Sequence, residues 1–386
     1  MVLVFSGLSI YLTYINFEVN AMVRDYEVGI ITKMSKNYGA VLQAYALKRS
    51  IEKLGHSTSV INYNGAVGND TYLLYKKGFG YFTFKYNIHR LLHRRDLKNS
   101  IKKFQDFRLK NFNLTTPYVN YTSLKKTPPK ASIYVVGSDQ VWNPKILFSP
   151  IYYLRFGNDG ATRISYAASF GEKNIHPDYK NVIKKYLEKF DAISVREDSG
   201  AALVHELGLN AKVVLDPTLL LGKDEWAKIA KAPLNIPEHF ILCYFLHYPP
   251  QIDYILKQIK EVYKVTVVNI ATDVGIKKIG DVQRWDIGPE EFIWLFQNAD
   301  AVVTSSFHGT VFSIIFDRPF YTLSLNKHDG RLFSLLNTLR LDNHLIHDPE
   351  KFDYNIFHTT YAGSDEIIER LRGLSLSYLE HNIIEK

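Results

Sequence analysis

The sequence predicts an α/β protein made of two consecutive domains with parallel sheets. Short apolar runs alternate with segments whose apolar residues recur at helical spacing, and polar loops follow the apolar runs. The 386 residues allow two or three domains, and a composition of 46% apolar and 22% charged residues excludes wholesale disorder. The single cysteine, Cys243, excludes an intrachain disulfide and a cysteine-rich metal site.

The first domain opens with a predicted strand, loop, helix and strand. Residues 26–31 form a short apolar run, residues 41–54 carry apolar side chains at helical spacing, and Gly55 favours the end of that helix. The next strand is predicted at residues 59–63. Because consecutive strands joined through a helix run parallel, this unit starts a parallel sheet. The pattern resumes with strands predicted at 132–136, 163–168, 191–195 and 211–215 and with helices at 178–189 and 198–207.

A second set of alternating strands and helices follows Asp216-Pro217-Thr218. Its strands are predicted at 240–245, 265–270, 301–305 and 320–323, and its helices at 251–262, 290–297, 310–316 and 331–339. In parallel sheets the ligand sites lie beyond the carboxyl ends of the strands and in the cleft between domains. We therefore expect the functional residues in the loops that follow the strands.

The chain divides into an extension, two domains and a tail. The extension covers residues 1–23, the domains cover 24–218 and 219–345, and the tail covers 346–386 as a helix that could pack back on the first domain. The first 17 residues are uncharged, but they are too polar for a spanning helix and lack the basic region of a signal peptide. Translation from Met22 is the favoured interpretation, and a membrane anchor is the alternative. The expected location is the cytoplasm, with the inner face of the membrane as a further site.

Residues 72–130 stand apart from the alternating pattern because they are rich in Lys, Arg, His, Tyr and Phe. The favoured interpretation is a solvated, amphipathic helical insertion. The alternative is a basic surface that faces phosphates or lipid headgroups. The whole chain has 47 Lys and Arg against 39 Asp and Glu, a net charge of +8. That balance suits an anionic small substrate or an anionic membrane surface, and no nucleic-acid partner is expected from it.

Two loops of the first domain carry candidate site residues. Asn37 and Gly39 lie where the first strand meets its helix, so backbone N–H groups there could bind an anionic or polar group. The loop after the strand at 132–136 contains Asp139, which could accept a proton from a sugar hydroxyl, and Trp142, which could stack on a sugar face. The alternatives are a helix cap for Asp139 and core packing for Trp142. The other polar candidates in this loop are Ser138 and Gln140.

The remaining candidates are cationic or lie at a strand–helix junction. Arg196 ends a predicted strand, and it could grip a carboxylate or phosphate with two N–H groups or form an ion pair with Glu197. His308 lies between the strand at 301–305 and the next helix, and histidine side chains, with an ordinary pKa of about 6.5, transfer protons near neutrality. The predicted anion-binding nest around it consists of Ser305, Ser306, Gly309 and Thr310. A cationic clamp could be completed downstream by Lys327 and Arg331.

Taken together, these loops resemble the polysaccharide pyruvyl transferase family. The resemblance extends from about residue 26 to residue 339 and rests on the ordered motifs Asn37-Tyr38-Gly39-Ala40, Gly137-Ser138-Asp139-Gln140-Val141-Trp142, Ser165-Tyr166-Ala167-Ala168-Ser169-Phe170-Gly171, Ser194-Val195-Arg196-Glu197, Asp216-Pro217-Thr218 and Ser305-Ser306-Phe307-His308-Gly309. It implies two Rossmann-like domains in a GT-B-like arrangement, with the active site in the interdomain cleft. It also implies transfer of a pyruvyl group from phosphoenolpyruvate to a hydroxyl pair of a hexose, with release of phosphate and formation of a cyclic ketal.

The resemblance also implies roles for particular residues. His308 is the best catalytic candidate, Asp139 is the second, and Arg196 matches a position that grips the donor in the family. Family members often carry Arg two residues before the histidine, where this chain has Ser306. The missing cation would then come from Lys327 or Arg331. The predicted donor contacts are Arg196, Ser305, Ser306, Gly309, Thr310, Lys327 and Arg331, and the predicted acceptor contacts are Asn37, Gly39, Ser138, Gln140 and Trp142.

No metal and no resident cofactor are expected, because phosphoenolpyruvate is itself a substrate. The expected acceptor is a glycan or lipid-linked oligosaccharide of a surface polysaccharide, which suits peripheral contact with a membrane. Two other functions stay open from the sequence. One is a GT-B-like glycosyltransferase that uses a nucleotide sugar, which the same fold and anion nest would serve. The other is a non-catalytic glycan-binding subunit, for which Ser306 in place of Arg would be a signature.

Overall fold

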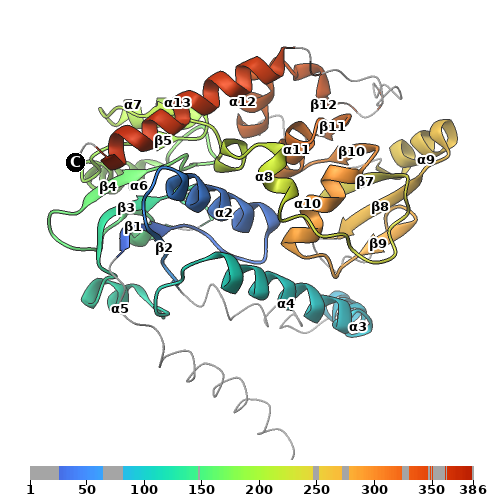
Figure 1. Cartoon of the computed structure of the whole chain (residues 1–386), viewed down its shortest axis with the longest axis horizontal. Coiled ribbons are helices and arrows are strands. Elements are labelled where there is room, and N and C mark those ends of the chain that lie inside the picture. Colours follow the sequence, from blue (N-terminus) through green and yellow to red (C-terminus); the bar gives the residue numbers. More distant parts are fainter. Residues whose placement is uncertain are drawn as a thin grey trace, which may run out of the picture.

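Two parallel sheets, one in each domain, form the framework of the molecule (Figure 1). The computed structural model describes residues 26–63, 81–146, 148–246, 252–271, 278–323, 330–346, 348, 350, 361 and 363–384. The predicted N-terminal extension, the predicted start at Met22 and the predicted donor contact Lys327 lie outside these residues. None of the helices in the described part of the chain has the length and apolarity that a bilayer span requires.

The first sheet has the strand order β2-β1-β3-β4, and all of its strands run parallel. The strands are β1 (Tyr26–Ile31), β2 (Thr58–Val60), β3 (Ala131–Val136) and β4 (Thr162–Ser165). A short parallel pair, β5 (Ser194–Val195) and β6 (Lys212–Val213), continues this sheet through bridges from Ile164 to Ala192 and from Ala168 to Val195. Alternating strands and helices therefore give the parallel sheet that the sequence predicts.

The second sheet has the order β12-β11-β10-β7-β8-β9 and is also parallel throughout. Its strands are β7 (Phe240–Phe245), β8 (Thr266–Ala271), β9 (Val282–Arg284), β10 (Ala301–Thr304), β11 (Phe320–Leu323) and β12 (Leu345–Ile346). The order of the strands reverses between β7 and β10, and in the first sheet it reverses between β1 and β3. Open parallel sheets bind ligands beyond the carboxyl ends of the strands at such reversals.

Helices cover both sheets and begin where side chains cap them. Asn37 accepts the N–H of Ala40 at 3.1 Å, so α2 (Tyr38–Lys53) starts earlier than the apolar spacing predicts. Ser306 caps α11 (Phe307–Ile315) in the same way, which places His308 inside the helix rather than before it. The other helices are α3 (Tyr81–Leu92), α4 (Arg94–Asn111), α5 (Tyr121–Lys126), α6 (Pro177–Leu187), α7 (Asp198–Glu206), α8 (Lys223–Ala227), α9 (Ile252–Tyr263), α10 (Pro289–Asn298), α12 (Gly330–Thr338) and α13 (Ser364–Ile384), with short 3₁₀ segments η2 (Pro150–Tyr153), η3 (Pro217–Leu220) and η4 (Asp342–His344).

The two domains meet through an aromatic contact at the start of α2. The Tyr38 ring stacks on Phe292 of α10 with a centroid distance of 4.5 Å, and it lies 5.0 Å from Phe104 of α4. The Tyr38 hydroxyl donates to the carbonyl of Ile287 at 2.9 Å. Because these rings are buried, the contact holds the first turn of α2 against the second domain.

Helix α13 crosses back from the second domain to the first, and Figure 1 shows its C-terminal end near β4. The Tyr378 hydroxyl donates to the carbonyl of Ser165 at 3.0 Å, and the Ser375 hydroxyl accepts the N–H of Leu215 at 3.0 Å. These bonds tie the helix to the chain beside two strands of the first sheet.

Candidate functional site

The carboxyl ends of strands from both sheets bring a cluster of charged side chains together. Asp139 follows β3, Arg196 follows β5, and His308 enters α11 shortly after β10. A fourth member, Asp216, caps the 3₁₀ segment η3 that joins the two domains. The cluster therefore lies where strand-end loops of the two domains meet, as expected for parallel sheets.

A buried ion pair between Arg196 and Asp216 is the centre of the cluster. Arg196 Nη1 lies 2.9 Å from Asp216 Oδ2, and the two side chains are 2% and 1% exposed. The other carboxylate oxygen of Asp216 accepts two hydrogen bonds from Thr218, one from its N–H at 3.0 Å and one from its hydroxyl at 2.6 Å. Burial by itself would raise the pKa of Asp216, but its neighbours His308 and Arg196 hold that pKa well below the usual range. Asp216 is therefore ionised at ordinary pH.

His308 approaches the same carboxylate from the second domain. Its Nε2 lies 3.7 Å from Asp216 Oδ2, and its side chain is 10% exposed. The ring packs directly on Gly39 of α2, where an added Cβ would lie 2.0 Å from His308 Nδ1. Only a glycine leaves room for the ring at this position. The Asn37-Tyr38-Gly39 turn thus places the histidine, a role that the prediction of Gly39 as an acceptor contact did not include.

Asp139 is the most open of three acids around Arg196; the others are Asp216 and Glu197, whose Oε2 lies 3.8 Å from Arg196 Nε, as in the ion pair that the sequence offered as the alternative. Its side chain is 21% exposed, and Oδ1 lies 4.0 Å from Arg196 Nη2. Its backbone φ of 70° lies in the left-handed region, and the same oxygen accepts the N–H of Gln140 at 2.8 Å. Burial would raise the pKa of Asp139, but Arg196, His308 and Lys33 lower it. Asp139 therefore holds a negative charge rather than a proton.

Lys33, which follows β1, joins the cluster although the sequence did not single it out. Its Nζ donates to the carbonyl of Gln140 at 2.6 Å. Burial lowers the pKa of Lys33, the Asp139 charge opposes that shift, and the Arg196 charge adds to it. The sequence could have indicated Lys33 through its position just after a predicted strand, because the loops after the strands of a parallel sheet carry the binding sites.

Several buried polar atoms of the cluster have no hydrogen-bond partner among the described residues. They are Nε and Nη2 of Arg196, Nε2 of His308 and Oε2 of Glu197. A native protein pairs most of its buried polar groups, and unpaired ones concentrate where a ligand or water completes the network. Nε and Nη2 of Arg196 face the carboxylates of Glu197 and Asp139 at 3.8 Å and 4.0 Å, too far for hydrogen bonds, so both can still donate to a ligand or to water.

A second arginine approaches the cluster from α12 in the second domain. The guanidinium groups of Arg196 and Arg331 lie 4.6 Å and 6.0 Å from the centre of the Phe307 ring. When the Gln140 amide oxygen faces Arg331, it lies 2.6 Å from Nη1. Arg331, predicted as part of a cationic clamp, is thus brought next to Arg196, and Phe307 is a contact that the sequence did not single out.

The sequence matches the family model for polysaccharide pyruvyl transferase over residues 37–327, which is most of the chain. The chain belongs to the polysaccharide pyruvyl transferase family. It is therefore a member of a transferase family of polysaccharide biosynthesis. A comparison with curated proteins finds no match.

Solved structures resemble this pyruvyl transferase family member in fold. The UDP-GlcNAc 2-epimerase of Methanocaldococcus jannaschii, in complex with UDP-GlcNAc and UDP, shares 14% identity at a TM-score of 0.51, with 92% of this chain and 100% of that chain covered. Arabidopsis thaliana UGT89C1, complexed with UDP-L-rhamnose, shares 11% identity at a TM-score of 0.48, with 94% and 100% covered. The first likeness confirms the predicted fold class of two Rossmann-like domains with parallel sheets in a GT-B-like arrangement.

The aromatic acceptor contact predicted for this family member is contradicted by the structure. Trp142 is 0% exposed, and its Nε1 donates to the carbonyl of Tyr152 at 2.8 Å. Its ring stacks on Tyr153 at a centroid distance of 5.7 Å and an interplanar angle of 6°, and Phe170 packs beside it. Because both faces of the ring are covered by the core, Trp142 has no face left for a sugar.

Most hydrogen-bonding groups of the predicted anion nest are already bonded within helix α11 and to the neighbouring strands. The Ser306 hydroxyl accepts the N–H of Gly309 at 3.4 Å, and Ser306 is 2% exposed. The Thr310 hydroxyl bonds to the Ser306 carbonyl at 3.1 Å and to Thr322 at 2.6 Å. Gly309 packs so closely on Thr304 that a Cβ would lie 2.3 Å from its hydroxyl. Ser306, Gly309 and Thr310 thus position His308, and their donor contacts stay predictions.

Four further predicted residues lie in the strand-end loops around the cluster. Ser138 is buried, and its hydroxyl donates to the carbonyl of Ala167 at 2.7 Å, so the turn uses it internally. Gln140 and Asn37 are only partly buried and lie on the same side as the cluster's loops. Ser305 directly follows β10, and its N–H donates to the carbonyl of Tyr244 at 3.4 Å.

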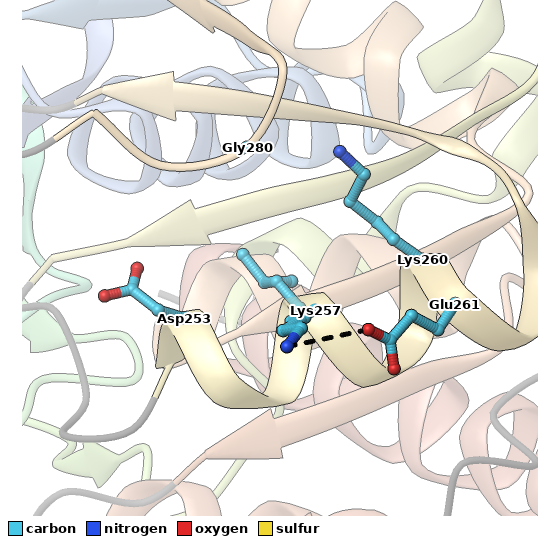
Figure 2. A pocket seen from close by; sticks show the side chains of 6 residues that line it. Asp253, Lys257, Lys260, Glu261 and Gly280 are labelled. Carbon is cyan, nitrogen blue, oxygen red and sulfur yellow. Dashed lines mark ion pairs between the residues drawn. The ribbon is translucent and has the colours of Figure 1, made fainter.

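Pockets elsewhere on the described surface contain none of the cluster residues. Figure 2 shows an open pocket of about 410 Å³ along α9, where Lys257 lies 3.7 Å from Glu261 and Lys260 pairs with Asp281. A second pocket of about 600 Å³ lies by the amino ends of β1, β3 and β4 and includes His56 and Glu27. Among the residues that the structure describes, no three His, Cys, Asp or Glu side chains gather as a metal site would require.

Proposed function

We propose that this protein transfers the pyruvyl group of phosphoenolpyruvate to two hydroxyls of a hexose, forming a cyclic ketal and releasing phosphate. The observation that carries the proposal is the buried Arg196, whose Nε and Nη2 have no hydrogen-bond partner among the described residues, beside His308. Family membership supports the general class of transfer. The acceptor would be a galactose- or mannose-type hexose of a surface polysaccharide or its lipid-linked precursor.

The donor needs cations, because phosphoenolpyruvate carries both a carboxylate and a phosphate. Arg196 hydrogen-bonds Asp216 through Nη1, whereas its Nε and Nη2 lie 3.8 Å from Glu197 and 4.0 Å from Asp139 without hydrogen bonds, so these two groups can still donate to an anionic oxygen. Arg331 also lies against Phe307, 6.0 Å from the ring centre, and the charge of Lys33 interacts with that of Asp139. Lys327 would add a fourth positive charge if it joins the site. This set replaces the Arg that family members often carry at the position of Ser306.

The reaction needs a general acid that protonates the methylene carbon of the donor, and His308 is suited to that step. Asp216 lies 3.7 Å from Nε2 and is ionised, so it orients the ring. Protonation makes the central carbon electrophilic, and an acceptor hydroxyl then attacks it. The bond between the central carbon and the phosphate oxygen then breaks and phosphate leaves, and the second hydroxyl adds to close the ketal as its proton passes to the departing phosphate.

The proton of the attacking hydroxyl needs a base, and the structure favours His308 over Asp139 for this step. The lowered pKa of Asp139 makes it a weak base. His308, having given its proton to the donor, is neutral and can accept the next one. Asp139 would instead balance the positive charge of Arg196 and accept a hydrogen bond from the acceptor through the exposed part of its carboxylate.

Thermal unfolding with phosphoenolpyruvate, UDP or GDP at equal concentration tests the donor. A ligand that binds only the native state stabilises it by about 2.7 kcal/mol at a concentration 100 times its dissociation constant. We expect phosphoenolpyruvate alone to raise the midpoint. A shift with a nucleotide alone would move the assignment to the glycosyltransferase alternative. No shift, together with no phosphate release in the presence of hexose acceptors, would favour the glycan-binding alternative.

Two variants test the assigned roles. His308→Ala should abolish phosphate release without loss of folding, whereas His176→Ala, whose side chain is 66% exposed, is the matched control. Arg196→Lys keeps a charge beside Asp216 but removes the unpaired N–H groups, so it should chiefly raise the KM for the donor. Normal turnover in His308→Ala, or an unchanged KM in Arg196→Lys, would contradict the respective role.

A further inference from the structure

Helix α3 exposes a stripe of large apolar side chains at the edge of the molecule. Phe84, Ile88, Leu91 and Leu92 are 65%, 43%, 64% and 73% exposed. At 100° per residue these positions fall within one face about 100° wide, which is the width of an amphipathic stripe. Single exposed apolar residues are common, but four on one helix face mark an interaction surface.

Basic residues follow this stripe along the chain. Residues 81–111, which form α3 and α4, contain nine Lys and Arg against two Asp, so they carry nearly all of the chain's net charge of +8. Arg94, Arg95 and Lys98 are exposed in the first turns of α4, directly after the stripe, and form no ion pair within the described part of the chain. A stripe of apolar side chains with a basic border is the pattern of helices that lie at the surface of anionic membranes.

The position of α3 allows such contact. Figure 1 shows α4 along one edge of the molecule with α3 at its far end, below β9. The opposite side of α3 is anchored to the protein, since Arg90 is only 7% exposed. A flat surface could therefore meet the stripe while the helix stays attached to the domain.

We propose that α3 and the first turns of α4 bind an anionic lipid surface. The four apolar side chains of α3 enter the boundary between headgroups and acyl chains, and Arg94, Arg95 and Lys98 lie against the anionic headgroups. Phe104, ten residues after Arg94 on α4 and so about 15 Å along that helix at 1.5 Å per residue, contacts Tyr38, the neighbour of Gly39 on which the His308 ring packs. This inference does not depend on the donor, and it would place the site near a lipid-linked acceptor.

The test is co-sedimentation of the full chain with vesicles of phosphatidylglycerol and phosphatidylcholine, compared with vesicles of phosphatidylcholine alone. We expect binding to the anionic vesicles only. Raising the salt from about 0.1 M to about 1 M shortens the screening length from about 10 Å to about 3 Å, so it should release much of the bound protein. Failure of the wild-type chain to sediment with the anionic vesicles would overturn the proposal.

Two pairs of substitutions locate the surface. Phe84→Gln with Leu92→Gln should weaken binding at least tenfold, whereas Leu374→Gln, on an exposed leucine of α13, is the control. Arg94→Gln with Arg95→Gln should weaken binding about 30-fold, at about 1 kcal/mol per basic residue. Lys184→Gln with Lys185→Gln on α6 makes the same charge change elsewhere and should have little effect.

Several results would refute the assignment. Equal binding by the stripe variant and the wild-type chain would show that α3 is not the contact. Equal losses of vesicle binding in the Arg94/Arg95 variant and the Lys184/Lys185 variant would show that only the net charge of the protein matters. A dimer in sedimentation equilibrium that the stripe substitutions abolish, without vesicle binding by the wild-type chain, would assign the stripe to a second copy of the protein instead.

Discussion

Replacing Gly39 with alanine tests the contact that places His308. The added Cβ would lie 2.0 Å from His308 Nδ1, 2.4 Å from Cγ and 2.5 Å from Cε1, whereas ordinary contact begins near 3.4 Å. The ring must therefore move by about 1.4 Å or the first turn of α2 must shift. Both groups are buried between the domains, so neither movement is free.

The size of the effect follows from two opposing contributions. Overpacking a buried site costs about 1–3 kcal/mol of unfolding free energy. Alanine in a helix is favoured over glycine by about 1 kcal/mol, which offsets part of that cost. Gly39→Ala should thus destabilise the wild-type chain by about 0–2 kcal/mol. In a His308→Ala background the clash is absent, so the same substitution should be neutral or stabilising by up to about 1 kcal/mol.

Urea unfolding of the four proteins of this double-mutant cycle measures the coupling between the two sites. We expect a coupling free energy of about 1–3 kcal/mol. Gly373→Ala in α13, where an added Cβ meets nothing within 4 Å, is the matched control and should not couple to His308. Equal effects of Gly39→Ala in both backgrounds would refute the contact. Turnover should also fall about 100-fold, since a displacement near 1 Å has that cost in an active site.

Two other predictions concern stability and pH. Asp216→Asn leaves the buried Arg196 without its charged partner, so it should cost about 3–5 kcal/mol at pH 7 in urea unfolding. The pKa of Asp216 is lower in the folded than in the unfolded chain, so its contribution to the free energy of unfolding is complete above about pH 4 and is lost as the pH falls. The difference in unfolding free energy between the wild-type chain and Asp216→Asn should therefore be about 1 kcal/mol smaller at pH 3 than at pH 7. The same difference in unfolding free energy at pH 7 and pH 3 would show that the charge of Asp216 is not its source. Trp142→Phe strands the Tyr152 carbonyl and should cost about 1–3 kcal/mol, with an unchanged acceptor KM. A large KM change without loss of stability would restore Trp142 as an acceptor contact.

The outcome for Trp142 shows where local patterns stop being informative. A tryptophan beside Asp139 in a loop after a strand is compatible with a sugar platform and with core packing. Core packing is decided by Tyr153 and Phe170, which lie against the Trp142 ring and come from other parts of the chain. No spacing in the loop itself contains that information.

The sequence by itself determined the architecture and the candidate centre. Strands alternating with helices require parallel sheets, and parallel sheets gather the loops after their strands, so Asp139, Arg196 and His308 could be identified from their positions along the chain. The family resemblance, which is carried by motifs in a fixed order, is confirmed by the family match.

Only the tertiary structure decided how these residues are paired. Asp216 becomes the partner of Arg196, Gly39 supports the His308 ring, and Lys33 joins Asp139 because the strand orders β2-β1-β3-β4 and β12-β11-β10-β7-β8-β9 do not follow the chain. Periodicity specifies which face of an element is buried, but it does not specify which elements become neighbours. That choice is made by burial of the shared apolar core, in which residues of both domains pack together.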